Sequence, residues 1–526
     1  MLSRKRVLWS ILVACCTFST PTYSQSMFHT LGWVNSSVPI EQAFRYPHLT
    51  EALYRSNRHQ LIWLQSQDRQ LFENLIENVV LADISPFFNQ RFQHLQHLRI
   101  TEQHYQYDLA ATDLLLAFLS YRALLKENKY TWLYGDGLPD NWAEPPPDVV
   151  ERLQLSVANG TLTPYLEGMG VALSVYQEYQ YSIQMLKSKL RDDIAPYPEQ
   201  LVRVGDTLPD RQVLFSRLAM AGLVVPDPIL QQTWYGKELR GVVKRFQRQH
   251  GLKADGVIGP DTAKWLNYPI EERIRRLALN AERSHLWPVQ RKALVLVNLP
   301  SFELHYYFNN KVVFSSKVIV GKQQRKTPLL EIKMDSLVLN PTWNVPPKIM
   351  REDIIPILRY NPGYLNKKGI QVIKGWGNPV IIDHGAIQWR KVNAKKFPFR
   401  MRQLSGQANA LGVYKFNTPN QRAIYLHDTP AKYLFDKSSR AFSSGCIRVQ
   451  HADKFAHSIS KTQGFKKRNI SPQGQQSNAR IPLKRRLPVH LIYKTSWVES
   501  GRVFFREDVY GYDAKANRAD LALKQK

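Results

Sequence analysis

Cys446 is the residue of this chain with the clearest capacity for covalent chemistry. The sequence contains three cysteines, and the other two, Cys15 and Cys16, lie in an apolar N-terminal stretch. Once that stretch is removed, a single thiol remains, which can form no intrachain disulfide and cannot supply the soft ligands of a structural zinc site. His427 ends an apolar run, residues 423–427, upstream of it. Because two adjacent strands can bring these side chains together, we interpret them first as a nucleophile and its base.

The residues around Cys446 suit this chemistry. An imidazole that takes the thiol proton leaves an ion pair, and in paired sites this lowers the thiol pKa. Gly445 allows a tight turn, so the amides of Gly445 and Cys446 are expected to point at a developing oxyanion. Arg448 would share a strand face with Cys446 and could hold a substrate carboxylate. The competing interpretation is a buried small thiol and a core histidine, neither with a chemical role.

The composition indicates several folded cores and an anionic partner. At 526 residues with 44% hydrophobic content, the chain can build more than one core. Its 72 Lys and Arg residues against 43 Asp and Glu residues give a formal charge of +29, which favours anionic envelope polymers or membrane headgroups. Nucleic acid is the usual partner of such charge, but an exported protein rarely meets it, so we expect no nucleic acid. A solvated basic surface is the alternative.

The first residues show an export pattern. Basic residues at positions 4–6 precede the apolar run 7–18, and the tripeptide at 22–24 offers a small-x-small cleavage site. The run is shorter than the roughly 20 residues that a membrane span needs. We therefore expect residues 1–24 to be a signal peptide or an N-terminal anchor, and a lipoprotein-type box ending at Cys15 is a third interpretation. Each places the rest of the chain in the periplasm, with peripheral or N-terminal membrane attachment as an option.

Residues 40–200 are predicted to be mostly helical. Residues 109–125 carry a dense apolar face at helical spacing, and residues 151–190 are similar. We see no catalytic constellation in this region. Asp108 and Asp113 are interpreted as helix-surface or capping residues.

A second unit is predicted over residues 201–268. Its signature is FQRQHGLKADGVIGPDT, residues 246–262. An amphipathic helix would end at Gly251, a typical glycine at a helix C-terminus. Asp255-Gly256 would form a turn, and Gly259-Pro260 would lead into another helix. The pattern resembles the small three-helix peptidoglycan-binding module of many cell-wall enzymes.

From residue 291 the sequence changes to short runs rich in Val, Leu, Tyr and Phe with turn residues between them, which predicts β structure. Pro300-Ser301 and Asn309-Asn310 are predicted hairpin turns. The expected strands are residues 293–298, 303–308, 312–320, 337–340, 413–416, 423–427, 489–493 and 503–505.

Residues 346–405 interrupt this β pattern with a long aromatic and basic insertion. Such an insertion is more often a lid or binding loop than idle chain. Its ends lie beside segments expected at the site, so we predict a mobile cap over Cys446; a small structural subdomain is the alternative. Trp376, Trp389, Phe397 and Phe399 would suit a surface that covers a substrate.

The segment around the cysteine resembles the L,D-transpeptidase family with its YkuD-type catalytic domain. The family pattern is a histidine, a spacer, and Ser/Thr-x-Gly-Cys followed by an apolar residue and Arg or Asn. Here it is His427 and SSGCIR, residues 443–448. Many members have a second histidine just before the glycine, where this chain has Ser444. Further motifs resemble the larger YcbB-like subgroup: VGK at 320–322, TP at 327–328, NPTWNVPP at 340–347, NALG at 409–412 and the tail 504–513.

The resemblance implies a cysteine enzyme that cross-links peptidoglycan stem peptides. Cys446 would attack the amide after the third residue of a donor tetrapeptide stem and expel D-alanine, with His427 as base and then acid. The acyl group would pass to the diaminopimelate amine of a second stem, giving a 3→3 cross-link. The third catalytic member would be the backbone carbonyl of Asp428 or its side chain. No metal, nucleotide or other cofactor is implied, and carbapenem-type inhibitors are expected to react.

Substrate contacts are expected from residues in or beside the matching motifs, namely Arg448, Ser444, Tyr425, Trp343 and Asn409. Two alternatives keep the thiol and change the acceptor. Water would make an L,D-carboxypeptidase, and a protein lysine would make a protein-anchoring enzyme. A non-catalytic wall-binding scaffold is a different class, but it has no need of a lone thiol in this motif. A papain-like protease would have its cysteine before its histidine.

The expected architecture is a multidomain α+β protein. A helical N-terminal scaffold region at 40–200 would precede the peptidoglycan-binding module at 201–268. A mainly β L,D-transpeptidase catalytic domain would follow at 290–513, with the cap insertion at 346–405.

Overall fold

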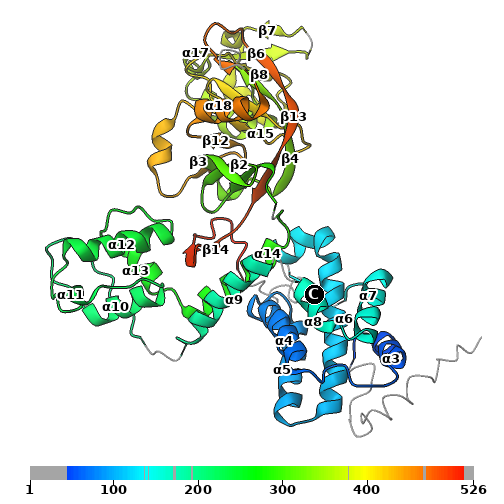
Figure 1. Cartoon of the computed structure of the whole chain (residues 1–526). Helices are drawn as coiled ribbons and strands as arrows, with labels where there is room; N and C mark the ends of the chain where they lie inside the picture. Colours follow the sequence, from blue (N-terminus) through cyan, green and yellow to red (C-terminus); the bar gives the residue numbers. More distant parts are fainter. Residues whose placement is uncertain are drawn as a thin grey trace, which may run out of the picture. The chain divides into compact units, whose positions relative to one another are not determined.

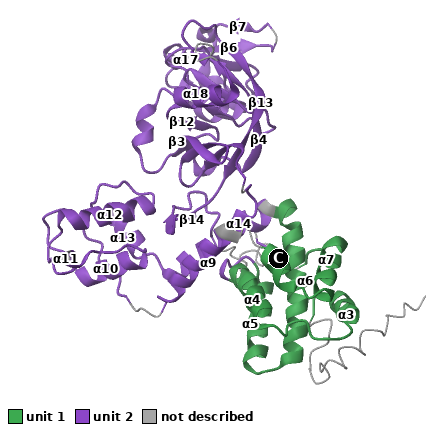
Figure 2. Ribbon diagram, in the orientation of Figure 1, with its two compact units in different colours: residues 1–80, 85–128, 139–170 green, residues 81–84, 129–138, 171–526 purple. Residues whose placement is uncertain are grey.

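Two compact units make up the chain (Figure 2). The smaller comprises residues 1–80, 85–128 and 139–170, and the larger comprises residues 81–84, 129–138 and 171–526. The computed structural model describes residues 44–135, 137–139, 141–169, 173–190, 194–288, 290–376, 378–465 and 470–514. The predicted export segment, residues 1–24, lies outside these ranges. Within them, no helix is long and apolar enough to cross a membrane.

The smaller unit is built from helices (Figure 1). Several of them begin with a proline, whose fixed φ suits the first helical turn. The apolar stretch predicted at 109–125 is the middle of the long helix α6, and the predicted stretch 151–190 is divided among shorter helices. The elements are α3 (Pro47–Ser56), α4 (Ser66–Leu81), α5 (Pro86–Ile100), α6 (His104–Tyr134), α7 (Pro147–Ala158) and α8 (Leu162–Gly168). The ends of α4 and α6, from residues 81 and 129, belong to the larger unit.

Asp108 and Asp113 on α6 are buried, at 2% exposure each, so their interpretation as helix-surface residues was wrong. Asp108 accepts hydrogen bonds from the amides of Ile62 and Trp63, at 3.0 and 2.8 Å, and from the Tyr54 hydroxyl. Asp113 accepts from the two amides that precede α3. Both carboxylates therefore cap the backbone of segments that are distant in sequence.

A series of helices precedes the strands of the larger unit. They are α9 (Leu173–Lys187), α10 (Arg211–Met220), α11 (Asp227–Leu230), α12 (Lys237–Gln249), α13 (Pro260–Leu266) and α14 (Ile270–Ser284). α12 is amphipathic and buries Leu239, Val243 and Phe246. Gly251 follows it at φ +67°, a left-handed conformation that glycine adopts without strain, as predicted for the end of this helix. The long helix α14 was not predicted.

A nine-stranded sheet of described residues lies within residues 293–492 (Figure 1). Its order is β11-β3-β12-β10-β9-β4-β13-β1-β2, and β2 also pairs with β3, which closes the sheet on itself. The strands are β1 (Ala293–Asn298), β2 (Glu303–Phe308), β3 (Lys311–Gly321), β4 (Leu330–Leu339), β9 (Tyr414–Asn417), β10 (Leu426–His427), β11 (Ala441–Ser443), β12 (Ile447–Val449) and β13 (Ala479–Ile492).

One face of this sheet is a continuous apolar row. Leu337, Phe416, Leu426 and Ile447 lie opposite one another on β4, β9, β10 and β12, and each is fully buried. Helix α18 (Ala452–Gln463) covers them, and the Phe455 ring lies 4.6 Å from the Phe416 ring. This packing fixes the register of the strands that carry the candidate site, because a one-residue slip would turn the core side chains outward.

The insertion has its own sheet and its own core. β5 (Trp343–Asn344), β8 (Arg400–Gln403), β6 (Ile370–Lys374) and β7 (Val380–Ile382) pair in that order. Its short helical segments are α15 (Pro347–Ile349), the π-helical turn η2 (Met350–Ile354), α16 (Ile355–Leu358) and α17 (Tyr364–Lys368). Trp389 and Phe397 are buried in its core, contrary to their predicted place on a covering surface, whereas Trp376 is 82% exposed. The insertion is thus a folded subdomain, and its motion stays a prediction.

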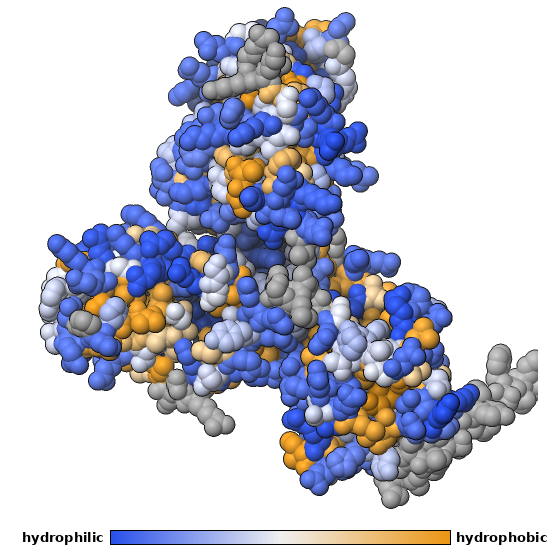
Figure 3. Space-filling view, viewed as in Figure 1, coloured by the Kyte–Doolittle hydropathy of each residue, from blue (hydrophilic) through white to orange (hydrophobic). Residues whose placement is uncertain are grey.

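The strand predictions were accurate for the first hairpin and less so elsewhere. β1 and β2 have the predicted bounds, and Asn309 and Asn310 form the turn after β2 with positive φ. β4 and β13 are longer than predicted, and β14 (Ser496–Glu499), the partner of β15 (Arg502–Phe505), was missed. Most of the surface in Figure 3 is hydrophilic, with hydrophobic residues gathered in patches.

Candidate active site

His427 lies on β10, and Cys446 directly precedes β12, the parallel neighbour of β10. β10 pairs with β12 so that His427 lies opposite Arg448. Opposite residues in a ladder point to one face, and alternate residues along a strand share that face. Cys446, two residues before Arg448, and Tyr425, two residues before His427, therefore lie on the same face. The residues between them are buried in the apolar row on the other side.

Lys415 joins this face from the next strand. β9 pairs with β10 so that Lys415 lies opposite His427. The Lys415 ammonium lies 4.4 Å from the centroid of the Tyr425 ring. The sequence prediction missed this residue. Side chains alternate between the two faces of a strand, so the predicted strand 413–416 already implied that Lys415 points away from the core. The face therefore presents one thiol, one imidazole, one phenol and two cations, on Lys415 and Arg448.

His427 is a neutral base with a fixed tautomer. Its Nδ1 lies 2.5 Å from the carbonyl oxygen of Asp428, and since a carbonyl can only accept, Nδ1 carries the proton. Nε2 is therefore the basic atom. Burial, together with the Arg448 cation, lowers the pKa of His427 to about 3. The imidazole is thus uncharged at neutral pH and can accept a proton during a reaction.

The Cys446 thiol is also neutral in the resting protein. Its Sγ lies 3.7 Å from the carbonyl oxygen of Ala423, to which the S–H group donates. Burial raises the thiol pKa above its ordinary value, while donors on Tyr425 and the cations of Lys415 and Arg448 act in the opposite direction. The expected resting ion pair with a lowered thiol pKa was therefore wrong, because burial outweighs the charges around the sulfur.

A strained turn precedes the thiol. Gly445 has φ +120°, which a residue with a side chain rarely adopts. Its amide donates to Ser443 Oγ at 3.1 Å, and Ser443 Oγ donates to the Cys446 carbonyl at 2.6 Å. Thr327 Oγ1 donates to the Gly445 carbonyl at 2.8 Å. Since the Gly445 amide is engaged, the Cys446 amide is the donor that we expect to face an oxyanion.

Asp428 contributes its backbone rather than its side chain to the histidine. The carboxylate binds the Lys432 ammonium and accepts from the Val413 amide at 3.2 Å. It also packs against Gly412, where an added Cβ would lie 2.3 Å from Asp428 Oδ2. Of the two options for the third member, the geometry supports the carbonyl.

Three segments of the chain match the sequence models of known domain families. Residues 292–467 match the sequence model of the L,D-transpeptidase catalytic domain, YkuD. The chain contains an L,D-transpeptidase catalytic domain. Residues 208–266 match the model described as "putative peptidoglycan binding domain", and residues 48–181 match a scaffold domain.

The matching relatives are themselves L,D-transpeptidases by name. A protein of Haemophilus influenzae named "putative L,D-transpeptidase" is 37% identical over 248 residues, 47% of this chain and 50% of that protein. The match thus spans half the length of that relative. Among solved structures, the L,D-transpeptidase of Xylanimonas cellulosilytica is 15% identical, with 57% of this chain and 100% of that chain covered and a TM-score of 0.18. The L,D-transpeptidase of Stackebrandtia nassauensis is 14% identical, with 57% of this chain and 97% of that chain covered and a TM-score of 0.24.

In this transpeptidase domain, Ser444 links the nucleophile turn, residues 443–446, to the cap insertion. Arg325 Nη1 donates to Ser444 Oγ at 2.9 Å, and the same guanidinium forms ion pairs with Glu352 and Asp353 on η2, at 2.7 and 2.5 Å. The Arg325 side chain is 8% exposed. Sequence reasoning missed Arg325, since nothing in the motif indicates that one guanidinium contacts both segments.

Trp343 and Tyr425 form a second link between the cap and the thiol. Trp343 lies on β5 of the cap sheet and interacts with the Tyr425 side chain, which in turn interacts with the Cys446 thiol. The structure thus places Tyr425 beside the sulfur itself. Asn409 differs from both: it is 1% exposed, donates to the Leu404 carbonyl at 2.7 Å and accepts from the Leu411 amide. Its amide holds a loop and is not presented to a substrate.

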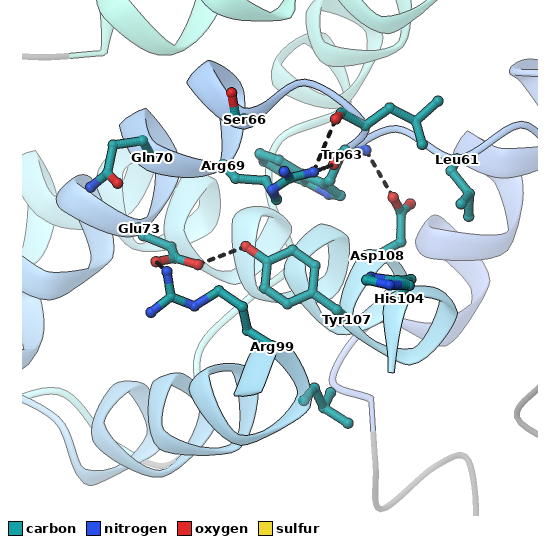
Figure 4. A pocket seen from close by; sticks show the side chains of 12 residues that line it. Leu61, Trp63, Ser66, Arg69, Gln70, Glu73, Arg99, His104, Tyr107 and Asp108 are labelled. Carbon is teal, nitrogen blue, oxygen red and sulfur yellow. Dashed lines mark hydrogen bonds and ion pairs between the residues drawn. The ribbon is translucent and has the colours of Figure 1, made fainter. Parts of the chain in front are cut away.

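A cavity in the smaller unit carries no such chemistry. It has a volume of about 350 Å³, and several of its polar side chains point toward one another (Figure 4). Glu73 accepts from Tyr107 and pairs with Arg99, and Arg69 donates to the Trp63 carbonyl. These groups are already satisfied. Across the described residues, no group of three or more His, Cys, Asp or Glu side chains could hold a metal ion.

Proposed function

We propose that this chain is a cysteine L,D-transpeptidase that forms 3→3 peptidoglycan cross-links through a thioester on Cys446. The observation that carries the proposal is the register of β10 and β12. It sets the basic Nε2 of His427, the Cys446 thiol and the Arg448 cation on one face of the sheet. Among the described residues, Cys446 is the free cysteine.

In the first step, Cys446 Sγ attacks the carbonyl carbon of the third residue of a donor stem. His427 Nε2 takes the thiol proton as the carbon–sulfur bond forms, since both groups are neutral beforehand. The Cys446 amide donates to the oxyanion. The carbon–nitrogen bond to D-alanine then breaks, and His427 returns the proton to the leaving amine.

In the second step, the side-chain amine of a second stem's diaminopimelate attacks the thioester carbon. His427 takes a proton from this amine, an amide forms, and the carbon–sulfur bond breaks to regenerate the thiol. Arg448 is the residue that would hold a stem carboxylate, because its guanidinium lies on the same face as the sulfur. Water in place of the amine would give L,D-carboxypeptidase activity, and a protein lysine would give protein anchoring.

Three features outside the active site support a role in the bacterial cell wall. The module at 208–266 supports peptidoglycan as a partner, and the charge of +29 suits an anionic polymer. The basic and apolar pattern of residues 1–24 supports export to the periplasm.

Muropeptide analysis of the purified full chain incubated with tetrapeptide-rich peptidoglycan tests the proposal. We expect 3→3 dimers with the wild type and none with Cys446→Ala, whose fold should persist. Product tripeptides without dimers would indicate the carboxypeptidase alternative. Undiminished dimers from Cys446→Ala would overturn the assignment of the nucleophile, and no product from the folded wild type would favour the non-catalytic scaffold.

A further inference from the structure

A cavity of about 230 Å³ lies in the larger unit. None of the described residues that line it belongs to the thiol face, the sheet face that carries Cys446, His427, Tyr425, Lys415 and Arg448. Five elements line it: α9, α10, α12, α14 and β15. Its walls are largely apolar. The apolar lining residues that matter for the argument are Met185, Leu186, Met220, Val503 and Phe505.

The charges around this cavity have one sign. Lys189, Arg273 and Arg502 line it, and none of the described lining residues is acidic. Cations grouped around an apolar cavity create a site that favours an anion. The Lys189 ammonium donates to the Ala219 carbonyl at 2.8 Å, so it is held at the rim.

Arg273 is a buried cation that lacks a carboxylate partner within the described residues. It is 2% exposed. Its Nε donates to the Tyr268 carbonyl at 3.2 Å, Nη2 donates to the Trp265 carbonyl, and Nη1 lies 3.0 Å from His250 Nε2. Burial lowers the pKa of Arg273 to about 10. An uncompensated buried charge is costly, and a bound anion would remove that cost.

His250 cannot be the missing counter-charge. Its Nδ1 lies 2.8 Å from the Phe246 carbonyl and must carry the proton, so Nε2 accepts from Arg273 as a neutral atom. Burial, with Arg273 beside it, lowers the pKa of His250 well below its ordinary value.

Gln249 supplies an independent sign of a ligand. The residue is 6% exposed and lines the cavity, and its side-chain oxygen Oε1 is buried without a hydrogen-bond partner. A buried acceptor without a donor is destabilising, and such groups are rare in folded proteins. A ligand with an N–H group would satisfy it.

We propose that this cavity binds the C-terminal end of a peptide. The terminal carboxylate would bind Arg273, the N–H of the last peptide bond would donate to Gln249 Oε1, and a small apolar side chain would pack against Met185 and Val503. The identification of this peptide as a peptidoglycan stem rests on the proposed function. A fatty acid offers a carboxylate without an N–H group, and inorganic phosphate offers no apolar part, so neither would use all three features.

The test is calorimetric titration of the full chain in a Cys446→Ala background, which prevents turnover. The ligands are a soluble tetrapeptide stem with a free carboxylate and the same peptide as its C-terminal amide. Met185 is 47% exposed on α9 and lines the cavity, so Met185→Glu adds a carboxylate there without disturbing the core. Met185→Gln is the matched control, because Gln and Glu have similar size and helix propensity.

We expect the free-acid peptide to bind the Met185→Gln protein at the cavity about tenfold more tightly than the Met185→Glu protein, the size of a charge-assisted contact. The amide peptide should not distinguish them. Gln249→Leu should weaken binding of the free acid and raise the melting temperature, because an unsatisfied acceptor is removed. The thiol face is identical in these proteins, so a difference reports the cavity alone.

Identical isotherms for Met185→Gln and Met185→Glu would overturn the proposal, as would equal binding of acid and amide peptides. Octanoate that binds as tightly as the peptide would assign the cavity to fatty acids instead. Formation of 3→3 dimers by the wild type is measured separately, so loss of this inference and loss of the proposed function can be told apart.

Discussion

The smaller unit and the thiol face both bury polar side chains, but they pair them differently. In the smaller unit, Asp108 accepts from two amides and a hydroxyl, and Asp113 accepts from two further amides. On the thiol face, His427 keeps its basic Nε2, because Nδ1 carries the proton. The Cys446 sulfur interacts with the Ala423 carbonyl at 3.7 Å and with Tyr425.

This difference separates structural from chemical burial. Burial raises the pKa of both Asp108 and Cys446, so a shifted pKa alone does not identify a reactive group. What distinguishes Cys446 is that a neutral base and two cations lie on the same face of the sheet as its thiol. The comparison predicts that substitutions in the smaller unit change stability, and that substitutions on the thiol face change reactivity.

His427→Gln should give the largest change in rate among variants that keep the thiol. The thiol loses its proton acceptor, and loss of a general base typically slows a reaction about 10²–10⁴-fold. Stopped-flow acylation of the full chain by a carbapenem measures this. His451→Gln, an exposed histidine at the start of α18, is the control and should react like the wild type. An unchanged rate in His427→Gln would mean that another group activates Cys446.

Asp108→Ala should show the opposite pattern. Two amides and the Tyr54 hydroxyl lose their acceptor, so we expect the smaller unit to lose ~3 kcal/mol of stability. Urea denaturation followed by circular dichroism measures the loss, with the exposed α5 residue substitution Gln90→Ala as control. The rate of Cys446 alkylation per folded molecule should stay the same. A parallel fall in that rate would contradict the division between the two regions.

The division also shows what the sequence could reveal. The helix end at Gly251, the hairpin at Asn309 and the cysteine motif were predictable, because each depends on a few neighbouring residues. Lys415 and Arg325 were not, because their roles come from strand register and from contacts between distant segments. The buried state of Asp108 was missed for the same reason. Burial of Trp389 in the cap core was missed because composition does not show which face an aromatic residue takes.

Lys415→Met should slow thiolate formation by a moderate factor. The Lys415 cation lowers the thiol pKa, so its removal raises that pKa and reduces the thiolate fraction at any pH below it. One pKa unit would slow iodoacetamide alkylation about tenfold. In the wild type, the rate should rise with pH through the raised thiol pKa, without a plateau on the acidic side. Lys333→Met, which changes an exposed residue of β4, is the control. A wild-type alkylation rate that stays constant below pH 6 would show that the thiol is ionised in the resting protein, contrary to this prediction.

Arg325→Gln should give the smallest effect, on products rather than on rate. It removes the ion pairs to Glu352 and Asp353 and the contact to Ser444, and so loosens the cap from the nucleophile turn. If the cap excludes water, the ratio of hydrolysed to cross-linked product should rise several-fold. Arg351→Gln, an exposed neighbour on η2, should leave the ratio unchanged. An equal ratio of hydrolysed to cross-linked product in both variants would show that the cap does not select the acceptor.

The intact mass of the protein after exposure to a carbapenem tests most directly whether Cys446 is the nucleophile. Attack of Cys446 on the lactam carbonyl opens the ring and releases no leaving group. We therefore expect a mass increase of one whole carbapenem on the wild type and none on Cys446→Ala, with peptide mapping placing the adduct on Cys446. An adduct of equal yield on Cys446→Ala, or no adduct on the folded wild type, would contradict it.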